Sequence, residues 1–163
     1  MLKIYFAGPI SGKSGDDVFG YYRSIEKEFA GLATVLSPMT GKAELRFEKS
    51  YDPKGYDSPV ATDHAIVERD LWMVKQADVV FANLYRSAWV SIGTISELAW
   101  AHQLGKHTVL AMEDENVHEH AFVLQMADIR FKQPREARDY LLGLARSWHG
   151  PEKKADGFLF STE

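Results

Sequence analysis

The chain has 163 residues, no cysteine, 45% hydrophobic residues and a formal net charge of −4, which suits one domain with a substantial core. The absence of cysteine excludes a disulfide framework, a thiolate nucleophile and a cysteine-ligated zinc or iron–sulfur site. The mild acidity argues against binding a nucleic-acid polymer. No apolar run reaches membrane-spanning length and no signal-peptide pattern opens the chain, so we expect a cytoplasmic protein without membrane contact.

Apolar runs and helical patterns alternate along the first half of the chain. Residues 2–7 form a short apolar run that ends at Gly8, which is typical of a buried parallel strand. Apolar side chains then recur at helical spacing over residues 18–32, and a second strand is predicted at 33–37. Residues 39–61 lack periodicity, and so long a connection in a compact domain is typical of a lid over a functional site.

The second half continues the alternation. Gly105 stands where a glycine commonly ends a helix, and Pro134 stands at a first helical position. Residues 149–163, rich in glycine, proline and charge, are expected to form a loose tail behind a single domain at 1–148. The elements predicted here are helices at 63–76, 93–104, 118–126 and 134–148 and strands at 78–84, 107–112 and 129–131.

This order of elements predicts an α/β fold, with a parallel sheet and helices on both faces. Ligands of such sheets bind beyond the carboxyl ends of the strands. The segments expected at that edge are 8–15, 38–60, 84–97 and 112–120.

Glu97 is the first candidate for chemistry. It follows a predicted strand-to-helix turn, and a carboxylate in the first turn of a helix is held ionised by the macrodipole, as a nucleophile requires. The alternative is a capping box, because Thr94 and Glu97 have the spacing in which the glutamate bonds back to the Thr94 amide.

Asp70 is the second candidate. Its neighbours at helical spacing are apolar, so it falls within the apolar stripe of its helix, where an unpaired carboxylate is costly. The alternative is an aspartate at the rim of the stripe, paired with a lysine or arginine. Two carboxylates that converge on one pocket would suit glycosidic chemistry. Asp78, which opens a strand, is interpreted as a structural residue.

The loop at residues 8–15 invites a phosphate-binding interpretation, because small residues, hydroxyls and Lys13 precede a helix. It does not match the ATP- and GTP-binding loop motif, because Lys13 stands where that motif needs its second glycine. A role in holding one phosphate or a sugar remains open, as does a plain tight turn. The histidines show no metal-site spacing, and Trp89 could stack on a ligand ring.

Taken together, the motifs resemble the nucleoside 2-deoxyribosyltransferase family and its relatives, the nucleoside 5′-monophosphate N-glycosidases. The resemblance covers about residues 3–131, and the order and spacing of the motifs carry it. The matching segments are KIYFAGP (3–9), RDL (69–71), ADVVFANL (77–84), GTISELAWA (93–101) and GK (105–106).

The resemblance implies a flavodoxin-like, Rossmann-like fold with a five-stranded parallel sheet. It also implies a homo-oligomer whose neighbouring subunit completes each site, and a retaining mechanism without cofactor or metal. Glu97 matches the nucleophile that forms a glycosyl ester with C1′. Asp70 matches the carboxylate near the sugar and leaving base, and Tyr5 matches the tyrosine that positions the nucleophile.

The transferases of this family usually carry an aspartate six residues before the nucleophile, where this chain has Ser91. In this respect the chain is similar to the nucleotide N-glycosidases, which place a serine on the 5′-phosphate. A carboxylate would repel a phosphate, whereas a hydroxyl can donate to it.

The other substrate-binding residues that the resemblance implies lie in two places. His120 falls near a phosphate-binding serine donated by the neighbouring subunit, and Ser11 replaces an arginine of the phosphate loop. The implied set is Gly8, Pro9, Ile10, Ser11, Gly12, Lys13, Ser91, Gly93 and His120.

We therefore expect cleavage of the N-glycosidic bond of a (2′-deoxy)nucleoside 5′-monophosphate or nucleoside, with hydrolysis favoured. Base exchange by a nucleoside 2-deoxyribosyltransferase is the alternative within the family. A non-catalytic nucleotide-binding sensor on the same fold is the alternative of a different class.

Overall fold

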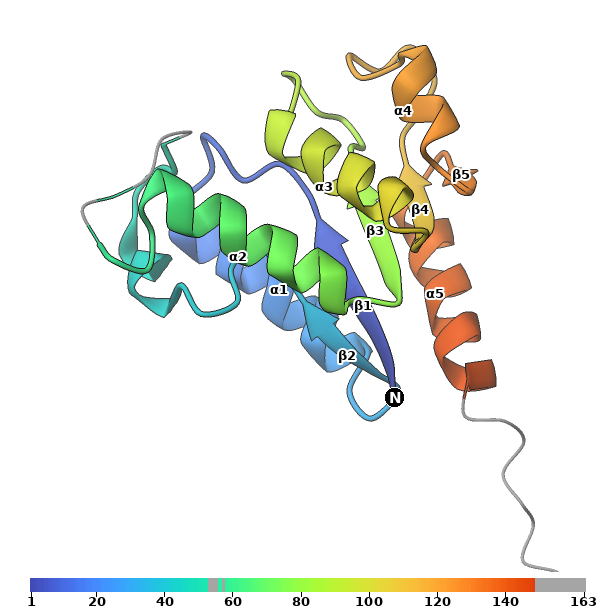
Figure 1. Cartoon of the computed structure of the whole chain (residues 1–163), viewed down its shortest axis with the longest axis horizontal. Helices are drawn as coiled ribbons and strands as arrows, with labels where there is room; N and C mark the ends of the chain where they lie inside the picture. The colour runs from blue at the N-terminus through green and yellow to red at the C-terminus, as the bar shows by residue number, and fades with distance from the viewer. Residues whose placement is uncertain (53–55, 57, 149–163) are drawn as a thin grey trace, which may run out of the picture.

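A computed structural model describes residues 1–52, 56 and 58–148. Five parallel strands form one sheet in the order β2-β1-β3-β4-β5 (Figure 1). This is the flavodoxin-like order, so the predicted fold class is confirmed. The strands are β1 (Leu2–Ala7), β2 (Ala33–Leu36), β3 (Val79–Asn83), β4 (His107–Ala111) and β5 (Ile129–Phe131); the helices are α1 (Gly15–Glu28), η1 (Ala43–Phe47), α2 (Asp63–Gln76), α3 (Ile92–Gln103), α4 (Ala121–Gln125) and α5 (Pro134–Trp148).

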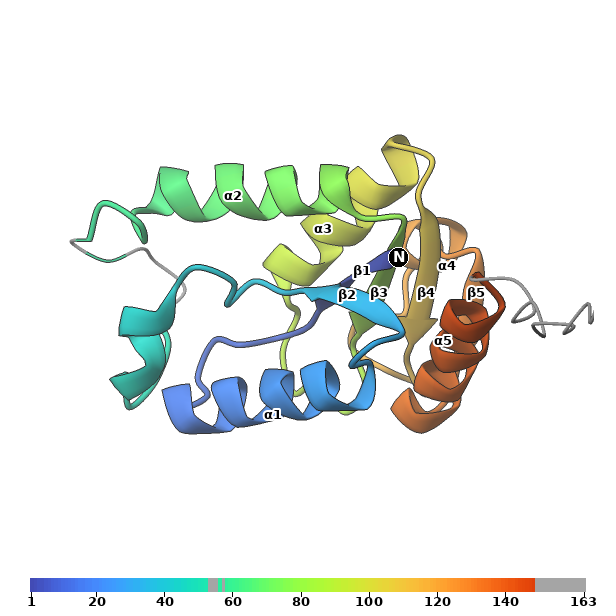
Figure 2. The same ribbon diagram turned by 90° about the horizontal axis from the view of Figure 1, so that it is seen from below.

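Helices cover both faces of the sheet, with α1 and α5 on one face and α2 and α3 on the other (Figure 2). Successive side chains along a strand point to opposite faces of the sheet, so apolar side chains pack against helices on both faces. In β1, Ile4 and Phe6 pack with the α1 and α5 residues, whereas Tyr5 and Ala7 pack with α2 and α3. Tyr5 therefore points toward the helix that carries Glu97.

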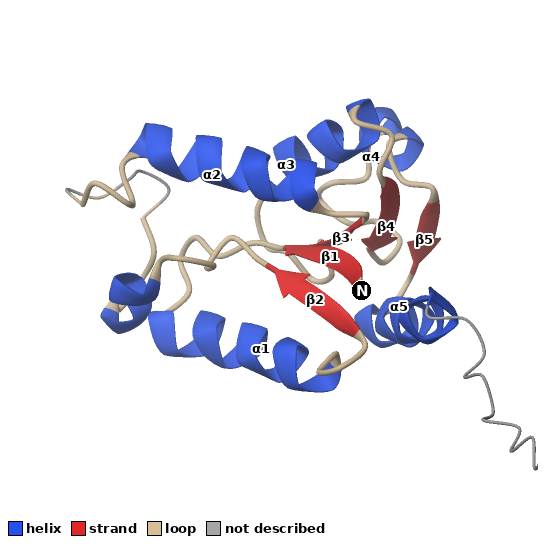
Figure 3. Cartoon of the chain, turned by 60° about the horizontal axis from the view of Figure 1, so that its bottom comes forward, coloured by secondary structure: helices blue, strands red, loops and turns tan. Residues whose placement is uncertain are grey.

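The sheet has a topological switch point between β1 and β3. The chain leaves β1 for β2 on one side and later enters β3 on the other side, with Ala7 of β1 paired to Ala82 of β3. The loops that follow β1 and β3 therefore leave the sheet at its carboxyl edge (Figure 3), where a switch point forms a crevice. Such crevices are where open parallel sheets bind ligands.

Local sequence signals set most helix ends. The side chains of Ser14 and Thr62 accept from the third residue beyond each, which caps α1 and α2. Gly105, with φ of 65°, follows Leu104, the C-cap of α3, and the Lys106 N–H donates to the Ala101 carbonyl to close this left-handed turn. Helix α1 ends at Glu28, earlier than the periodicity predicts, because the backbone turns at Phe29.

The 39–61 segment is more ordered than its sequence indicates. It contains the η1 turn, and Leu45 and Tyr51 are buried against the core. The Tyr51 N–H donates to the Lys13 carbonyl, and the Gly12 N–H donates to the Tyr51 carbonyl, each at 3.0 Å. The described part of this segment is therefore bonded to the loop after β1. Its role as a lid stays a prediction.

Two sequence predictions concern the ends of the molecule. The expected loose tail at 149–163 lies outside the described residues. Across the part of the chain that the structure describes, no helix combines the length and apolar character needed to span a membrane.

Candidate active site

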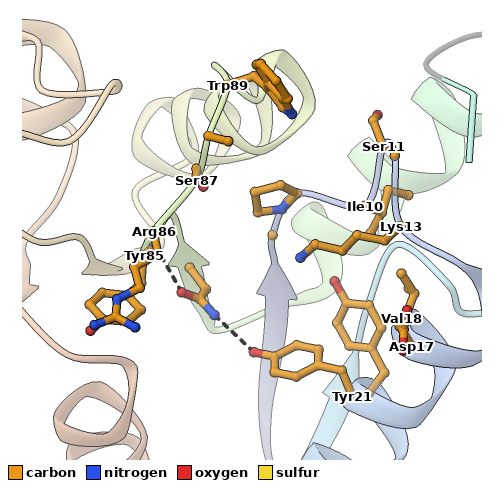
Figure 4. A pocket seen from close by; sticks show the side chains of 16 residues that line it. Ile10, Ser11, Lys13, Asp17, Val18, Tyr21, Tyr85, Arg86, Ser87 and Trp89 are labelled. Carbon is orange, nitrogen blue, oxygen red and sulfur yellow. Dashed lines mark hydrogen bonds between the residues drawn. The ribbon is translucent and has the colours of Figure 1, made fainter.

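A cavity of about 600 Å³ opens at the switch point of the sheet (Figure 4). The loop after β1 forms one wall, and the segment that ends β3 forms the other. The first two turns of α1 contribute the remaining side chains. The lining residues are 8–13, 17–18, 21–22, 83 and 85–89.

All six loop residues predicted to hold a phosphate or sugar, residues 8–13, line this cavity. Gly12 adopts φ of 78°, which favours glycine, and the Lys13 N–H donates to the Ile10 carbonyl at 3.0 Å. From this tight turn the Lys13 side chain extends into the cavity (Figure 4). The loop therefore combines a tight turn with a cation that a ligand in the cavity could meet.

Residues 83–89 on the opposite wall offer amide, hydroxyl and ring groups. The Asn83 side-chain amide donates to the Tyr21 hydroxyl at 3.4 Å, which ties the end of β3 to α1. The Ser87 hydroxyl is buried and has no hydrogen-bond partner among the described residues. The nearby Trp89 is 79% exposed. This wall thus leaves a hydroxyl and an indole ring available to a ligand.

Tyr5, Lys42, Asp70 and Glu97 form a buried group that we call the carboxylate cluster. The Tyr5 hydroxyl donates to Oε1 of Glu97 at 2.5 Å, and the two residues are 0% and 5% exposed. The Lys42 Nζ lies 3.3 Å from Oδ1 of Asp70. The cluster joins β1, α2, α3 and the segment after β2, so the three predicted catalytic residues come together in the fold.

Burial dominates the protonation of the carboxylate cluster. It raises the pKa of Glu97 to about 8, and the charge of Asp70 adds to this, while the Tyr5 hydrogen bond and Lys42 oppose it. Burial also raises the pKa of Asp70 to about 6, against the lowering effect of Lys42. At neutral pH the free protein therefore holds a proton on Glu97 and an ionised Asp70 beside Lys42.

Tyr22 lines the cavity and also interacts electrostatically with the carboxylate cluster. Its pKa is raised by burial first and then by Tyr21, Glu97 and Asp70. Tyr22 also borders a second hollow of about 310 Å³ between α1 and residues 37–46. Glu97 itself does not line the cavity, and 5% of its surface is exposed.

The nucleoside 2-deoxyribosyltransferase family model matches residues 4–146, from β1 into α5. The chain belongs to this family. The resemblance of the sequence motifs is thereby confirmed, and family membership supports an enzyme that transfers or hydrolyses a nucleoside glycosyl bond.

Solved structures provide a second comparison, of the fold. The 2-desoxiribosyltransferase from Leishmania mexicana is 21% identical, with a TM-score of 0.55 over 88% of this chain and 98% of that chain. A conserved protein from Enterococcus faecalis V583 is 18% identical, with a TM-score of 0.56 over 90% and 98%. The CMP N-glycosidase of Clostridium botulinum is 17% identical, with a TM-score of 0.49 over 87% and 96%. A search of the curated proteins gives no match.

Two predictions about the surroundings of Glu97 in this family member are wrong. Helix α3 begins at Ile92 with Ser91 as its N-cap, so Glu97 lies in the second turn, beyond the reach of the macrodipole. The Glu97 carboxylate accepts from Tyr5 instead of capping the helix, and the Thr94 hydroxyl lies 2.9 Å from that of Ser91. Burial, and not the helix dipole, sets the pKa of Glu97.

The structure agrees with part of each interpretation of Asp70. The residue lies in the buried stripe of α2, as the helical spacing predicts, with 7% of its surface exposed. It also has a cationic partner, as the alternative required, but Lys42 is buried with it instead of lying at the surface.

Ser91 and Gly93 lie at the N-terminus of α3, outside the cavity lining. The Ser91 N–H donates to Nε2 of the buried His118 at 2.7 Å, and the other ring nitrogen lies 2.8 Å from Oδ1 of Asn116. Because Nε2 accepts, His118 is neutral with its proton on Nδ1, and it fixes the start of α3. No heavy atom lies within 4 Å of a Cβ built on Gly93, so this position is open.

His120 lies apart from the cavity. Its ring accepts from the Phe122 N–H at 3.3 Å at the start of α4 and stacks on the Phe122 ring. A role in the site of a neighbouring subunit stays a prediction. Asp78 accepts from the Lys3 N–H at 2.9 Å and so links the starts of β1 and β3, which agrees with its structural interpretation.

Sequence reasoning missed two residues of the site. Lys42 stands in a segment without periodicity, and a lysine there carries no signal of burial. The helical spacing places Tyr22 in the apolar stripe of α1, where it does pack, but its side chain also lines the cavity. Knowing that α1 begins at the ligand edge of the sheet would have pointed to Tyr22.

Proposed function

We propose that the protein cleaves the N-glycosidic bond of a (2′-deoxy)nucleoside 5′-monophosphate through a covalent glycosyl ester on Glu97, with water as the usual acceptor. The observation that carries this proposal is the buried Tyr5–Glu97 hydrogen bond with Asp70 beside it. Two carboxyl groups with separated pKa values are the equipment of a retaining glycosidase.

In the first half-reaction, an oxygen of ionised Glu97 bonds to C1′ and the C1′–N bond breaks. The base leaves with that electron pair and takes a proton from the protonated Asp70 carboxyl. Tyr5 holds the attacking carboxylate by its hydroxyl hydrogen bond. The developing positive charge on the sugar favours ionised Glu97, which offsets the effect of burial on its pKa.

In the second half-reaction, water bonds to C1′ and the ester bond to Glu97 breaks. The carboxylate of Asp70 accepts the proton of that water, which returns the carboxylate cluster to its starting charge. Two displacements at C1′ retain the configuration of the sugar. A free base in place of water completes base exchange on the same intermediate.

The preference for a 5′-phosphate is supported by Lys13, which lines the cavity, and by Ser91, which lies outside the cavity lining. Ser91 at the start of α3 can donate to a phosphate, and Lys13 extends into the cavity (Figure 4). The free N–H groups at the start of the 12-residue helix α3 favour an anion as well.

The test is a chromatographic screen of deoxynucleosides and their 5′-monophosphates for released base, with and without an acceptor base. We expect base release by the wild-type protein and a loss of about 1000-fold or more in Glu97→Gln. Glu68→Gln, an exposed glutamate on the helix of Asp70, is the matched control and should keep full activity.

Two outcomes of this screen would contradict the proposal. Ligand binding without any base release would identify a nucleotide sensor. Efficient base exchange on unphosphorylated deoxynucleosides, with little hydrolysis, would identify a transferase and remove the argument from Ser91.

The phosphate preference has its own prediction. Lys13→Met removes a charge-assisted contact worth roughly 1.5–3 kcal/mol, so kcat/KM for a monophosphate should fall about 10- to 100-fold. The value for the corresponding nucleoside should change far less. Lys27→Met, at the other end of α1, is the control. Equal losses on nucleotide and nucleoside would show that Lys13 does not contact the phosphate.

A further inference from the structure

Lys42 has an unusual position for a lysine, because its side chain is only 2% exposed. Its Nζ lies 3.3 and 3.5 Å from the two carboxylate oxygens of Asp70. A buried ammonium is costly unless a counter-charge compensates it. An unbranched apolar side chain would fill the same volume without that cost, so the charge itself needs an explanation.

The backbone around Lys42 is built to place this side chain. The Thr40 N–H donates to the Ser37 carbonyl, and the Lys42 N–H donates to the Met39 carbonyl, so two turns follow β2 directly. Gly41, inside the second turn, adopts φ of 76°, a conformation that favours glycine. The lysine therefore enters the core from a fixed turn and not from a mobile surface loop.

The titratable groups around Asp70 come from five parts of the fold. Lys42 approaches from the turn after β2, Arg69 is its neighbour on α2, and Glu97 faces it from α3. The Tyr5 and Tyr22 hydroxyls, from β1 and α1, are neutral, because burial and the two carboxylates raise each tyrosine pKa well above its usual value.

The guanidinium of Arg69 hydrogen-bonds outside the carboxylate cluster, because it donates to the Val60 carbonyl at 2.6 Å. Among the described residues, Lys42 is therefore the cation that contacts a carboxylate of the cluster, and that carboxylate belongs to Asp70. One buried positive charge balances one of two carboxylates, and charge balance leaves one proton for the pair.

We propose that Lys42 is a positioning residue that acts through Asp70 to hold the Asp70–Glu97 pair at a single shared proton. This inference rests on the proposed function. With one proton in the pair, Glu97 becomes the ionised nucleophile when the proton moves to Asp70, and Asp70 then has the proton that the leaving base takes. No exchange with solvent is needed before the C1′–N bond breaks.

Without the Lys42 charge, burial favours the neutral form of both carboxyl groups. Both would then keep their protons at neutral pH, and no nucleophile would be available. The lysine thus sets the pH range in which the cluster can react, without touching the substrate itself.

The experiment compares wild type with Lys42→Met and Lys42→Arg, because the two substitutions separate charge from shape. Methionine keeps the length and volume but removes the charge, and arginine keeps the charge but changes the shape. The first readout is ¹³C NMR titration of the Asp70 and Glu97 carboxyl carbons, assigned with Asp70→Asn and Glu97→Gln. The second is the pH profile of kcat/KM for base release.

We expect both carboxyl titrations, and the acidic limb of the pH profile, to move up by at least one pH unit in Lys42→Met. Activity at pH 7 should fall about tenfold or more and recover at higher pH. Lys42→Arg should keep the wild-type titrations and pH profile, even if its kcat is reduced. In the wild type, the ¹⁵N shift of the Lys42 ammonium should follow the Asp70 titration.

Three results would overturn the inference. One is a Lys42→Met protein whose titrations and pH profile overlay those of the wild type. Another is the reverse order, with Lys42→Arg displaced and Lys42→Met normal, which would indicate a packing role. If Lys42→Met does not fold, a wild-type ¹⁵N shift that ignores Asp70 would still contradict it. The NMR titrations need no turnover, so absence of base release would count against the proposed function alone.

Discussion

The side chain of Glu97 combines two properties that oppose each other. Its burial beside Asp70 raises its pKa to about 8, yet a carboxylate nucleophile must be ionised to attack C1′. The Tyr5 hydroxyl and the Lys42 ammonium favour the ionised form. The free protein therefore keeps Glu97 as a neutral carboxyl, and a cationic transition state can stabilise its ionised form.

The raised pKa of Glu97 predicts an effect of this residue on the free energy of unfolding. The folded protein keeps a proton on Glu97 up to about pH 8, whereas an unfolded glutamate loses it near pH 4.5. Unfolding thus releases a proton in this range, so the free energy of unfolding falls as pH rises from about 5 to 8. Glu97→Gln removes this term and should be more stable than wild type at pH 8, by on the order of 2–4 kcal/mol.

Urea denaturation at several pH values measures this difference. It should shrink as pH falls below 5 toward 4, because the unfolded glutamate then becomes protonated as well. The Glu68→Gln control should follow the wild type at every pH. A constant difference between Glu97→Gln and wild type across the range would show that Glu97 titrates normally.

At the residue scale, the sequence predicts three candidate catalytic residues but not their environment. Tyr5, Asp70 and Glu97 were found through motif order, and they do meet in the fold. Lys42 could not be found, because its burial depends on where the turn after β2 meets α2, which no local pattern encodes. The capping-box alternative placed the N-cap of α3 at Thr94, whereas the observed N-cap is Ser91, three residues earlier.

At the scale of elements, the 39–61 segment is joined to the start of α1. A Cβ on Gly15 would lie 2.0 Å from the Arg46 carbonyl oxygen, and the Gly15 N–H donates to the Glu48 carbonyl at 2.7 Å. The η1 turn therefore packs directly on the backbone of α1. This contact holds the segment that carries Lys42.

We predict that Gly15→Ala destabilises the protein by roughly 1–3 kcal/mol, because the methyl group collides with backbone atoms and forces η1 away. Base release should fall as well, since Lys42 moves with its segment. Denaturant unfolding and the base-release assay measure the two effects.

Gly20→Ala is the control for this substitution. Gly20 also lies in α1, but no heavy atom is within 4 Å of its Cβ position. Alanine there should stabilise the helix by up to about 1 kcal/mol. If Gly15→Ala were as stable as Gly20→Ala, the packing of η1 on α1 would be wrong.

The elements themselves were largely predictable, because alternation and caps are local signals. All five strands lie where apolar runs predicted them, and Pro134 begins α5 as expected. The η1 turn was not predicted. Its buried residue, Leu45, and the nearby Tyr51 belong to no periodic pattern, and both pack in the core cluster that contains α1 residues.

At the scale of the whole molecule, one apolar surface lies near the cavity. Trp89, Val90 and Ile92 are 79%, 56% and 77% exposed around the start of α3. Such neighbouring exposed apolar side chains commonly mark an interface. We expect a second copy of the chain to cover them, as an oligomer with shared sites requires.

Ile92→Glu tests this expectation. A glutamate at the first position of α3 suits the helix dipole, so the fold should be kept. In analytical ultracentrifugation the wild type should sediment as an oligomer and the variant as a monomer with reduced base release. A wild-type protein that is monomeric and fully active at assay concentration would contradict the expectation.

The fold class followed from the alternation of strands and helices, and the strand order places the cavity at the β1–β3 switch point. The position of the carboxylate cluster behind that cavity required the tertiary structure. It depends on which face of the sheet Tyr5 occupies, and on the crossing of α2 and α3 above it.

The central claim is that Glu97 bonds covalently to C1′ of the sugar. The most direct measurement is peptide mass spectrometry of the protein quenched in acid during turnover of a deoxynucleoside 5′-monophosphate. We predict a mass increase equal to the deoxyribose phosphate residue on Glu97, absent from Glu97→Gln. Base release at the full rate with no adduct on Glu97, or with the adduct on another residue, would contradict the account.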